Sequence, residues 1–440
     1  MNSDNTISNL KKIIAFGIVF LFILTTASHA LSSDTYISSE KEEMEIKDVQ
    51  TISDEKELHL LRGEHYLYVN ASDDVDEFHI RFVFPPDYGY QVPIYLEIYN
   101  DTTANISHYQ IEDDSDGLNK LINFAIGPMT ENESVLIHFS CWVLVKNHDF
   151  SDLPEEQKFP RRLKLPEETK PWLSATEVVQ KNSILIRFKA RQLRGIKNDM
   201  IRFAGRVAPF IKQHRFFLFL IQLRFGIFLS QDARTTLFIN GENVGRSHLA
   251  CAFFRSQNIP ARVLLAHNDQ GFWTQMHYMV EYYTPGYGWV LLDSTKGKTP
   301  YETKRQIINR ICFPEDEDDT KTDYIFPYMK GEERWLWIDT EDVYPYFVDC
   351  DRGSKSQMFI ESEITTDSYK VDYSFLLTQI VFHQYEQYLG MNLTGENQAH
   401  FENATMYQKQ AMEELIETED LNDYIYYMDS AFDEYKEIEL

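Results

Sequence analysis

Cysteine is scarce in this sequence, and basic residues are few relative to acidic ones. The 440 residues include four cysteines, too few to hold a chain of this length together as a disulfide scaffold. There are 42 Lys and Arg against 69 Asp and Glu, a formal net charge of −27. A nucleic-acid binder needs a basic face that displaces counterions from phosphates, so this balance argues against that class. The apolar fraction of 43% is ordinary for a globular protein and excludes wholesale disorder.

Long apolar runs are also missing, since a membrane-spanning helix needs about 20 apolar residues. The run from Ile13 to Leu24 follows Lys11 and Lys12 and precedes the small-x-small tripeptide that ends at Ala30. This order is typical of a secretory signal. We therefore predict a signal peptide at residues 1–30, no nucleic-acid partner, and a secreted or cell-surface, extracytoplasmic location. The alternative is an uncleaved N-terminal anchor, which would associate the chain with a membrane.

Sequons and cysteines agree with export. The chain has six Asn-x-Ser/Thr sequons, which predict a glycoprotein. They begin at Asn70, Asn100, Asn105, Asn132, Asn392 and Asn403. Export permits disulfides, and among the three full pairings of four cysteines we favour Cys312 with Cys350. The apolar stretch 216–229 is interrupted by polar residues and predicts a buried helix rather than a membrane span.

The spacing of apolar residues divides the mature chain into four segments. Residues 31–60 are polar and predict a linker. Residues 61–160 alternate apolar and polar positions, as at Phe78–Phe84, and predict an antiparallel β-sandwich. Residues 161–300 mix helical and strand patterns. Residues 301–440 are acidic and predict a mostly helical region.

Individual elements follow from the same spacing. In the third segment we predict helices at 184–193 and 200–211 and strands at 280–283 and 289–292. In the fourth we predict helices at 375–389, 398–417 and 421–438, and a solvated loop at the acidic run 315–319.

Charge is distributed unevenly among these segments. Residues 161–300 hold 21 Lys and Arg against 9 Asp and Glu, a net charge of +12, whereas residues 301–440 hold 11 against 32, a net charge of −21. The basic segment is thus flanked by acidic ones. Either the acidic flanks dock on it and neutralise it, or its basic face attracts an acidic partner such as a wall polymer or an anionic glycan.

One stretch of the basic segment carries residues suited to chemistry. A glycine-containing turn leads into an apolar helix, an arginine and Ile-Pro-Ala-Arg follow, and two strand-like segments then hold a histidine and an aspartate. These segments are 241–255, 259–262, 277–281 and 288–295. Over residues 232–295 the pattern resembles the transglutaminase-like superfamily. The resemblance implies an α+β, papain-like core, in which a helix N-terminus presents a thiol to a histidine and an aspartate on an antiparallel sheet.

The resemblance places His277 on the family's catalytic histidine and Asp293 on its aspartate. Asn243 occupies the position of the nucleophile. The neutral amide of asparagine is a poor nucleophile, so we predict that thiol catalysis is lost while the fold is kept. Asparagine is also a favoured N-cap, and we expect Asn243 to cap the helix. The alternative is that its amide binds a ligand, or orients a water that His277 activates.

Three nearby residues could replace the thiol. Cys251 lies eight residues further, about 12 Å along a helix, and is expected to be a buried core thiol. Ser247 could reach His277 only if the helix begins later than expected. His248 is interpreted as a structural histidine.

Cofactor motifs are missing as well. The acidic run 315–319 lacks the glycine and terminal glutamate of a calcium loop, no Cys and His spacing suits zinc, and there is no glycine-rich phosphate loop. No cofactor or metal is predicted.

Three functions compete. The first is an exported pseudoenzyme that binds a protein, a peptide or a cell-surface polymer. The second is an active amide-bond hydrolase or acyltransferase that uses His277 and Asp293 with an unconventional nucleophile. The third is a structural surface protein. They are distinguished by whether the histidine and the aspartate meet and by whether any amide is turned over.

Overall fold

The computed structural model describes most of the chain from Glu55 onward. The described residues are 55–115, 117–212, 230–239, 241–268, 276–302, 304–319, 336–345 and 356–439. The predicted signal peptide (1–30), residues 31–54 of the predicted linker, the apolar stretch 216–229 and Cys350 lie outside them. None of the helices in these ranges is long and apolar enough to cross a membrane.

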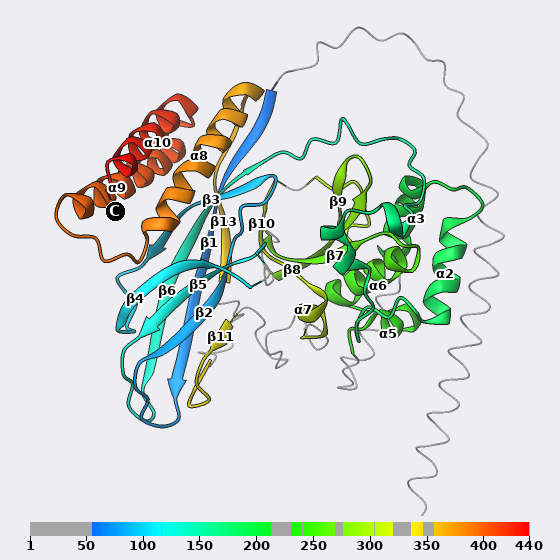
Figure 1. Cartoon of the computed structure of the whole chain (residues 1–440), viewed down its shortest axis with the longest axis horizontal. Helices are drawn as coiled ribbons and strands as arrows, with labels where there is room; N and C mark the ends of the chain where they lie inside the picture. Colours follow the sequence, from blue (N-terminus) through cyan, green and yellow to red (C-terminus); the bar gives the residue numbers. More distant parts are fainter. Residues whose placement is uncertain are drawn as a thin grey trace, which may run out of the picture. The chain divides into compact units, whose positions relative to one another are not determined.

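Two antiparallel sheets make up the first part of the molecule, called here the two-sheet region (Figure 1). One sheet has the order β12-β1-β6-β3, and β13 also pairs with β1; the other has the order β11-β2-β5-β4. The first contains β1 (Glu55–Ala71), β3 (Gln91–Ile98), β6 (Ser134–Lys146), β12 (Val343–Pro345) and β13 (Ser356–Asp367). The second contains β2 (Phe78–Phe84), β4 (Ile106–Asp113), β5 (Lys120–Ile126) and β11 (Leu336–Ile338).

Alternating side chains build the core between these sheets. Along β2, Phe78, Ile80 and Phe82 are buried while Arg81 between them is exposed. Residues of one strand point alternately to opposite faces, so this period of two puts the apolar set on one side. The ring of Phe82 lies 5.5 Å from that of Phe139 on β6, which joins the two sheets. The alternation predicted at Phe78–Phe84 is therefore present.

Strands from distant parts of the chain complete the two sheets. β1 begins at Glu55, inside the segment expected to be a linker, and pairs with β13 from Glu55↔Asp367 to His65↔Ser356. The strands β11, β12 and β13 come from the segment expected to be mostly helical. Their pattern is weak because two are short and β13 lies beside β1 at the edge of its sheet, with Glu363 exposed.

Three helices follow β13 and agree with the helices expected near the C-terminus. They are α8 (Ser368–Tyr388), α9 (Glu396–Thr418) and α10 (Leu421–Lys436). Gln408 of α9 donates a 2.9 Å hydrogen bond to the carbonyl of Ile94, and Tyr385 of α8 lies 3.5 Å from that of Leu96. Both carbonyls belong to the edge strand β3, so the helices cover an edge that would otherwise pair with another chain.

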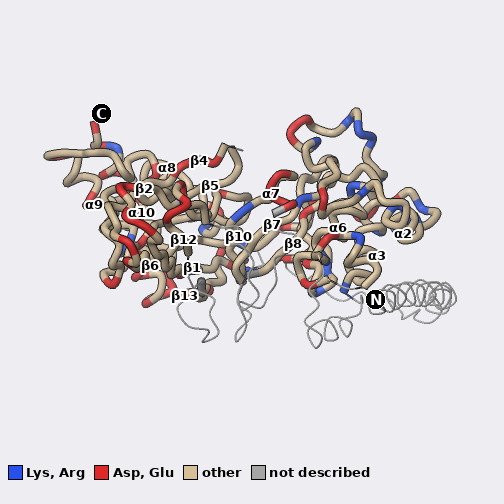
Figure 2. The backbone as a smooth tube through the Cα atoms, turned by 90° about the horizontal axis from the view of Figure 1, so that it is seen from below, with Lys and Arg blue, Asp and Glu red and all other residues tan. Residues whose placement is uncertain are grey.

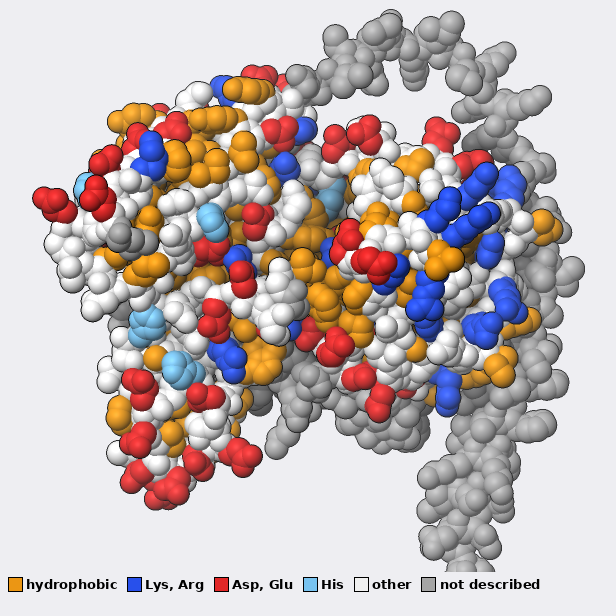
Figure 3. All heavy atoms as spheres, in the orientation of Figure 1, with side chains coloured by type: hydrophobic (Ala, Val, Ile, Leu, Met, Phe, Trp, Pro, Cys, Tyr) orange, Lys and Arg blue, Asp and Glu red, His pale blue; other side chains and the backbone are white. Residues whose placement is uncertain are grey.

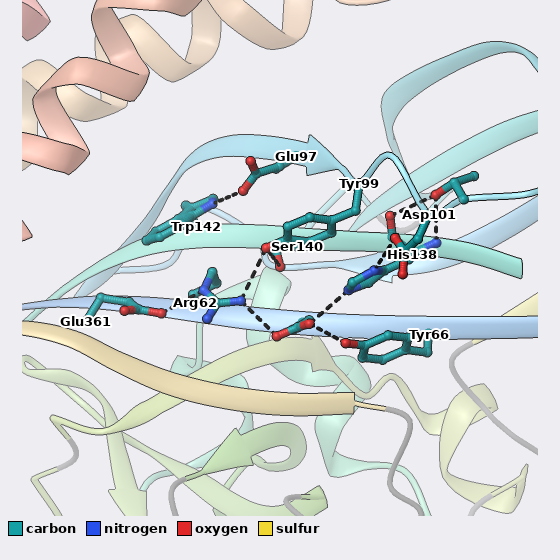
Figure 4. Close-up of polar contacts among 11 residues, drawn as sticks. Arg62, Tyr66, Glu97, Tyr99, Asp101, His138, Ser140, Trp142 and Glu361 are labelled. Atoms are coloured by element: carbon teal, nitrogen blue, oxygen red, sulfur yellow. Dashed lines mark hydrogen bonds and ion pairs between the residues drawn. The ribbon is translucent and has the colours of Figure 1, made fainter. Parts of the chain in front are cut away.

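The outer face of the first sheet carries a network of polar and aromatic side chains around His138 (Figure 4). The Nε2 of His138 lies 2.8 Å from Oε1 of Glu64, and its Nδ1 lies 2.7 Å from Oδ1 of Asp101. The imidazole stacks between the rings of Tyr66 and Tyr99, at 4.0 and 4.1 Å between centroids. The network therefore joins β1, β6 and the turn after β3.

A second group of elements forms an α+β module. Its sheet has the order β10-β7-β8-β9 and is antiparallel. The strands are β7 (Ala261–Asn268), β8 (Met276–Thr284), β9 (Gly288–Leu292) and β10 (Gln306–Ile311); the helices are α2 (Ile184–Arg194), α3 (Met200–Lys212), α5 (Ala233–Phe238), α6 (Asn243–Ser256) and α7 (Pro314–Asp319). Helices α2 and α3 and strands β8 and β9 fall where the sequence predicts them. β10 and α7 lie beyond the expected boundary at residue 300.

Two buried amide side chains fix the α+β module to the two-sheet region. Gln91 both donates to and accepts from the backbone of Ile308, each bond 2.8 Å long. Asn119 does the same with Ile311, at 2.9 and 2.7 Å. β10 is an edge strand of the module's sheet and pairs with the inner strand β7. These contacts therefore attach that sheet to the two-sheet region.

Candidate functional site

Helix α6 begins at the position where the resemblance expects a nucleophile. Asn243 is its first helical residue and is 8% exposed. Glu242 is the N-cap, and its side chain makes no capping hydrogen bond. The expectation that Asn243 caps the helix is therefore wrong: it lies one residue inside, where its own N–H is one of those that an α-helix leaves without an intrahelical acceptor.

Gly241 and Gly245 let the preceding segment approach this helix end. A Cβ at Gly245 would lie 2.6 Å from Oγ1 of Thr236 and 2.7 Å from Oε1 of Gln231. Oε1 of Gln231 accepts a 2.8 Å hydrogen bond from the N–H of Glu242. The amide of Gln231 therefore satisfies the backbone N–H of the N-cap residue, a group that the N3 side chain satisfies in a capping box.

His248 faces the same segment. Its Nδ1–H donates a 2.6 Å hydrogen bond to the carbonyl of Gln231, and burial lowers the pKa of its imidazole to about 4. A neutral, buried and hydrogen-bonded ring fits the structural interpretation of this histidine.

His277 and Asp293 meet in the interior of the module. His277 lies on β8 and Asp293 directly follows β9, the antiparallel neighbour of β8. Nε2 of His277 is 3.1 Å from Oδ2 of Asp293, and the two side chains are 1% and 0% exposed. Oδ1 of Asp293 accepts hydrogen bonds of 2.8 Å from the N–H groups of Thr295 and Lys296.

The surroundings of Asp293 favour its charged form. Burial raises the pKa of this carboxyl, but the hydrogen bond and charge of His277 and the two backbone N–H groups together outweigh burial, so its pKa is lowered. An ionised, anchored aspartate holds the histidine in one orientation and in the tautomer with hydrogen on Nε2.

Two serines bring the start of α6 to this pair. Ser294, next to Asp293 in the chain, places its hydroxyl 3.5 Å from the carbonyl of Asn243 and 3.0 Å from the hydroxyl of Ser247. Ser247 itself donates to the carbonyl of Asn243, at 2.9 Å. Through Ser294 the backbone of Asn243 is thus linked to the residue next to Asp293, which in turn contacts His277.

Arg246 is a charged residue near the start of α6 that the sequence analysis missed. It lies one helical turn after Asn243, and the charges of Glu242 and Asp293 both raise the pKa of its guanidinium. Burial is the larger effect and lowers that pKa overall. Its Nε is buried and makes no hydrogen bond within the described part of the chain. The spacing of three from Asn243 was the signal that could have found it.

The other nucleophile candidates are poorly placed. Cys251 is fully buried two turns along α6, and burial raises the pKa of its thiol, which disfavours the reactive thiolate. The hydroxyl of Ser247 is also buried, and it is engaged by the carbonyls of Asn243 and Tyr278 and by Ser294.

Buried ion pairs hold the frame around the site. Arg255, at the end of α6, pairs with Glu317 of α7, and both side chains are 0% exposed. Arg262 of β7 pairs with Glu281 of β8 at 2.8 Å. Glu317 belongs to the acidic run 315–319 expected to be a solvated loop; that expectation is wrong, because the run forms α7 and inserts this carboxylate beside a buried guanidinium.

Within the described ranges, no group of three or more His, Cys, Asp or Glu side chains is arranged to hold a metal ion.

Comparison with known proteins agrees with the α+β module. Residues 226–294 match the model of the transglutaminase-like superfamily. A candidate cysteine protease from Cytophaga hutchinsonii has 14% sequence identity and a TM-score of 0.44, and the match covers 70% of this chain and 99% of that one. The periplasmic domain of TgpA from Pseudomonas aeruginosa has 11% identity and a TM-score of 0.24, covering 54% of this chain and 88% of that one. No curated protein matches the sequence. Residues 226–294, which belong to a module of mixed helix and antiparallel sheet, are therefore similar to the transglutaminase-like superfamily.

Proposed function

We propose that the chain is an exported protein whose transglutaminase-like module binds a protein, a peptide or a cell-surface polymer without thiol chemistry. The observation that carries this proposal is the pairing of Asn243, at the start of α6, with an intact contact between His277 and Asp293. A side chain that cannot form a thiolate stands where the family has its nucleophile, while the partners of that nucleophile are kept.

The groups at the site favour a ligand that accepts hydrogen bonds. The first N–H groups of α6 carry partial positive charge, and the guanidinium of Arg246 lies one turn away. The amide of Asn243 can both donate and accept. A peptide carbonyl, a side-chain amide or a carboxylate would be recognised by such donors.

Binding is tested with a peptide library and purified protein. Peptides captured by the wild type should bind Asn243→Ala and Arg246→Met at least about tenfold more weakly, since each variant removes a hydrogen bond worth about 1.5 kcal/mol. Arg234→Met, at an exposed position on α5, is the matched control and should bind like the wild type. Equal binding by all four proteins would place the recognition surface elsewhere.

A second function, amide hydrolysis, is favoured by the same buried His277–Asp293 contact. In this alternative His277 takes a proton from a water, the hydroxide adds to the amide carbonyl, the C–N bond breaks, and the amine leaves with the proton. Incubation of a peptide panel with wild type and His277→Ala, followed by mass spectrometry, separates the two functions. Cleavage by the wild type alone would replace the binding proposal. If neither binding nor cleavage is detected, the result favours the structural surface protein.

Export rests on the sequence of residues 1–30 and the six sequons. Edman sequencing of protein from an overproducing host tests it. We expect the mature chain to begin at Leu31, and a chain that still carries residues 1–30 would support the anchor instead.

A further inference from the structure

We propose that the outer face of α2, together with the turn that follows it, binds the surface of an anionic lipid bilayer. This surface, called here the α2 face, consists of the apolar Ile184, Phe188 and Ile196 and the basic Arg187, Arg191 and Lys197. It is separate from the site at α6, and the proposal does not depend on the function proposed above.

Exposed apolar side chains are the first observation. Ile184, Phe188 and Ile196 are 83%, 63% and 104% exposed, although the same helix already buries Ile186 and Ala190 against the module. A helix at the surface of a soluble domain normally presents polar residues outward. Large apolar side chains gathered on an outer face indicate a surface that contacts a partner or a membrane.

Positive charge beside these side chains is the second observation. Ile184 and Phe188 are four residues apart, as are Arg187 and Arg191, so an apolar stripe and a basic stripe run next to each other along the helix. Figure 3 shows basic side chains gathered over the part of the molecule formed by α2 and α3, with apolar ones among them. The charges extend beyond the stripe, since residues 181–212 hold nine Lys and Arg and a single acidic residue, Asp199.

The acidic segments that the structure describes leave this charge available. In Figure 2 basic positions lie around α2 and α3, while acidic positions follow α9 and α10. Those helices pack on each other, on α8 and on β3. Within the described ranges, none of the ion pairs joins Arg187, Arg191 or Lys197 to a carboxylate. On α3, Arg202 pairs at 3.7 Å with Asp199, the residue just before that helix. In the part of the chain that the structure describes, the acidic flanks therefore do not neutralise the α2 face through ion pairs.

The combination of the two stripes favours lipid over a soluble polyanion. A polyanion in water would be attracted by the arginines but would gain little from Ile184 and Phe188. At a bilayer surface the apolar side chains enter the boundary between headgroups and acyl chains, while guanidinium groups contact anionic headgroups. The overall charge of −27 repels the rest of the protein from such a surface, which would orient the chain with the α2 face toward it.

Vesicle sedimentation of the full chain tests the proposal. We expect binding to phosphatidylcholine vesicles that contain phosphatidylglycerol, weaker binding to phosphatidylcholine alone, and loss of binding as salt is raised. Each arginine near the surface contributes about a fivefold increase in partitioning, so Arg187→Ser/Arg191→Ser should bind about 25-fold more weakly. Ile184→Ser/Phe188→Ser should also lose most of its binding. The controls Arg81→Ser and Tyr426→Ser change exposed residues elsewhere and should bind like the wild type.

Each other outcome contradicts the proposal in a recognisable way. If residues 13–24 caused the binding, both vesicle types would bind and no α2 variant would matter. If loss occurred only in the arginine double variant, and dextran sulfate bound with the same dependence, the partner would be an acidic polymer. Thermal unfolding of each variant, expected to match the wild type because these side chains are exposed, verifies that the fold is kept.

Insertion can be observed directly at Ile184. Cys141, Cys251 and Cys312 are buried, so a polarity-sensitive thiol dye should label Ile184→Cys in preference to them. Its emission should shift to shorter wavelength when phosphatidylglycerol vesicles are added, and unchanged emission would overturn the proposed insertion.

Discussion

The Nε2 of His277 lies 3.1 Å from Oδ2 of Asp293, deep inside the α+β module whose helix α6 begins with Asn243. Because Asp293 engages Nε2, Nδ1 is the ring nitrogen that remains for proton exchange. An asparagine amide gives that nitrogen no acidic proton to take. The geometry thus keeps a buried histidine and aspartate in hydrogen-bond contact, in a module whose helix α6 begins with a side chain that is a poor nucleophile.

The role of Asp293 predicts a dependence of stability on pH. The pKa of its carboxyl is lowered in the folded protein, so its contribution is present above the unfolded value of about 3.9 and is lost as pH falls through the folded value. Asp293→Asn should lower the free energy of unfolding by about 1.5–3 kcal/mol at neutral pH. Urea unfolding at neutral and acidic pH measures this difference, which should shrink on acidification. A constant difference would show that packing, rather than charge, is the cause.

The close approach of α5 and α6 predicts opposite effects at two glycines. Gly245→Ala places a methyl group against Thr236 and Gln231 and should destabilise the protein by about 1–3 kcal/mol. Gly205→Ala, on α3, meets nothing within 4 Å and should stabilise by about 0.5–1 kcal/mol, because alanine favours a helix. Thermal unfolding of both variants checks the prediction. Equal shifts of the same sign would mean that the helix end is not tightly packed.

The buried ion pair Arg255–Glu317 predicts a large loss of stability when one partner is replaced. Glu317→Gln leaves the guanidinium of Arg255 buried without its counter-charge and should cost about 3–5 kcal/mol. Glu315→Gln, an exposed neighbour on α7, should change stability by less than about 0.5 kcal/mol. Replacing the pair together, as Arg255→Met/Glu317→Leu, should restore part of the loss. Urea unfolding of the three proteins distinguishes a structural ion pair from one that contributes little.

The network around His138 predicts unequal contributions from its two carboxylates. Glu64 is largely buried; burial raises the pKa of its carboxyl, but hydrogen bonds from Tyr66 and His138 and the charge of Arg62 lower it overall. Glu64→Gln should therefore cost about 1.5–3 kcal/mol. The side chain of Asp101 is 59% exposed, and Asp101→Asn should cost less than about 1 kcal/mol. Losses of equal size in urea unfolding would contradict this ranking.

Local patterns were readable from the sequence, whereas long-range partners were not. The alternation at Phe78–Phe84 and the spacing of α2 and α8 to α10 depend on neighbours in the chain, and these elements were predicted. Glu317 was read as solvated because its partner, Arg255, is 62 residues away in the sequence. β13 was missed because edge strands need no strong apolar pattern, and its partner β1 lies near the other end of the described chain.

The candidate site was likewise predictable from local spacing only in part. Motif spacing located Asn243, His277 and Asp293, but an N-cap and a first helical residue differ by one position, which spacing does not determine. Arg246 was overlooked because its importance comes from Asp293, which only the fold brings close.

Thiol labelling of Asn243→Cys tests the central claim, that the site is intact but disarmed. A thiol at the N-terminus of α6 beside His277 should have a lowered pKa and react quickly with iodoacetamide below pH 7, while Cys251 stays unlabelled. Asn243→Cys/His277→Ala, the matched control, should lose this reactivity at low pH. Peptide mapping identifies the labelled residue. Slow labelling of Asn243→Cys that follows the usual thiol pKa of about 8.5, or rapid labelling of Cys251 in the wild type, would contradict the account.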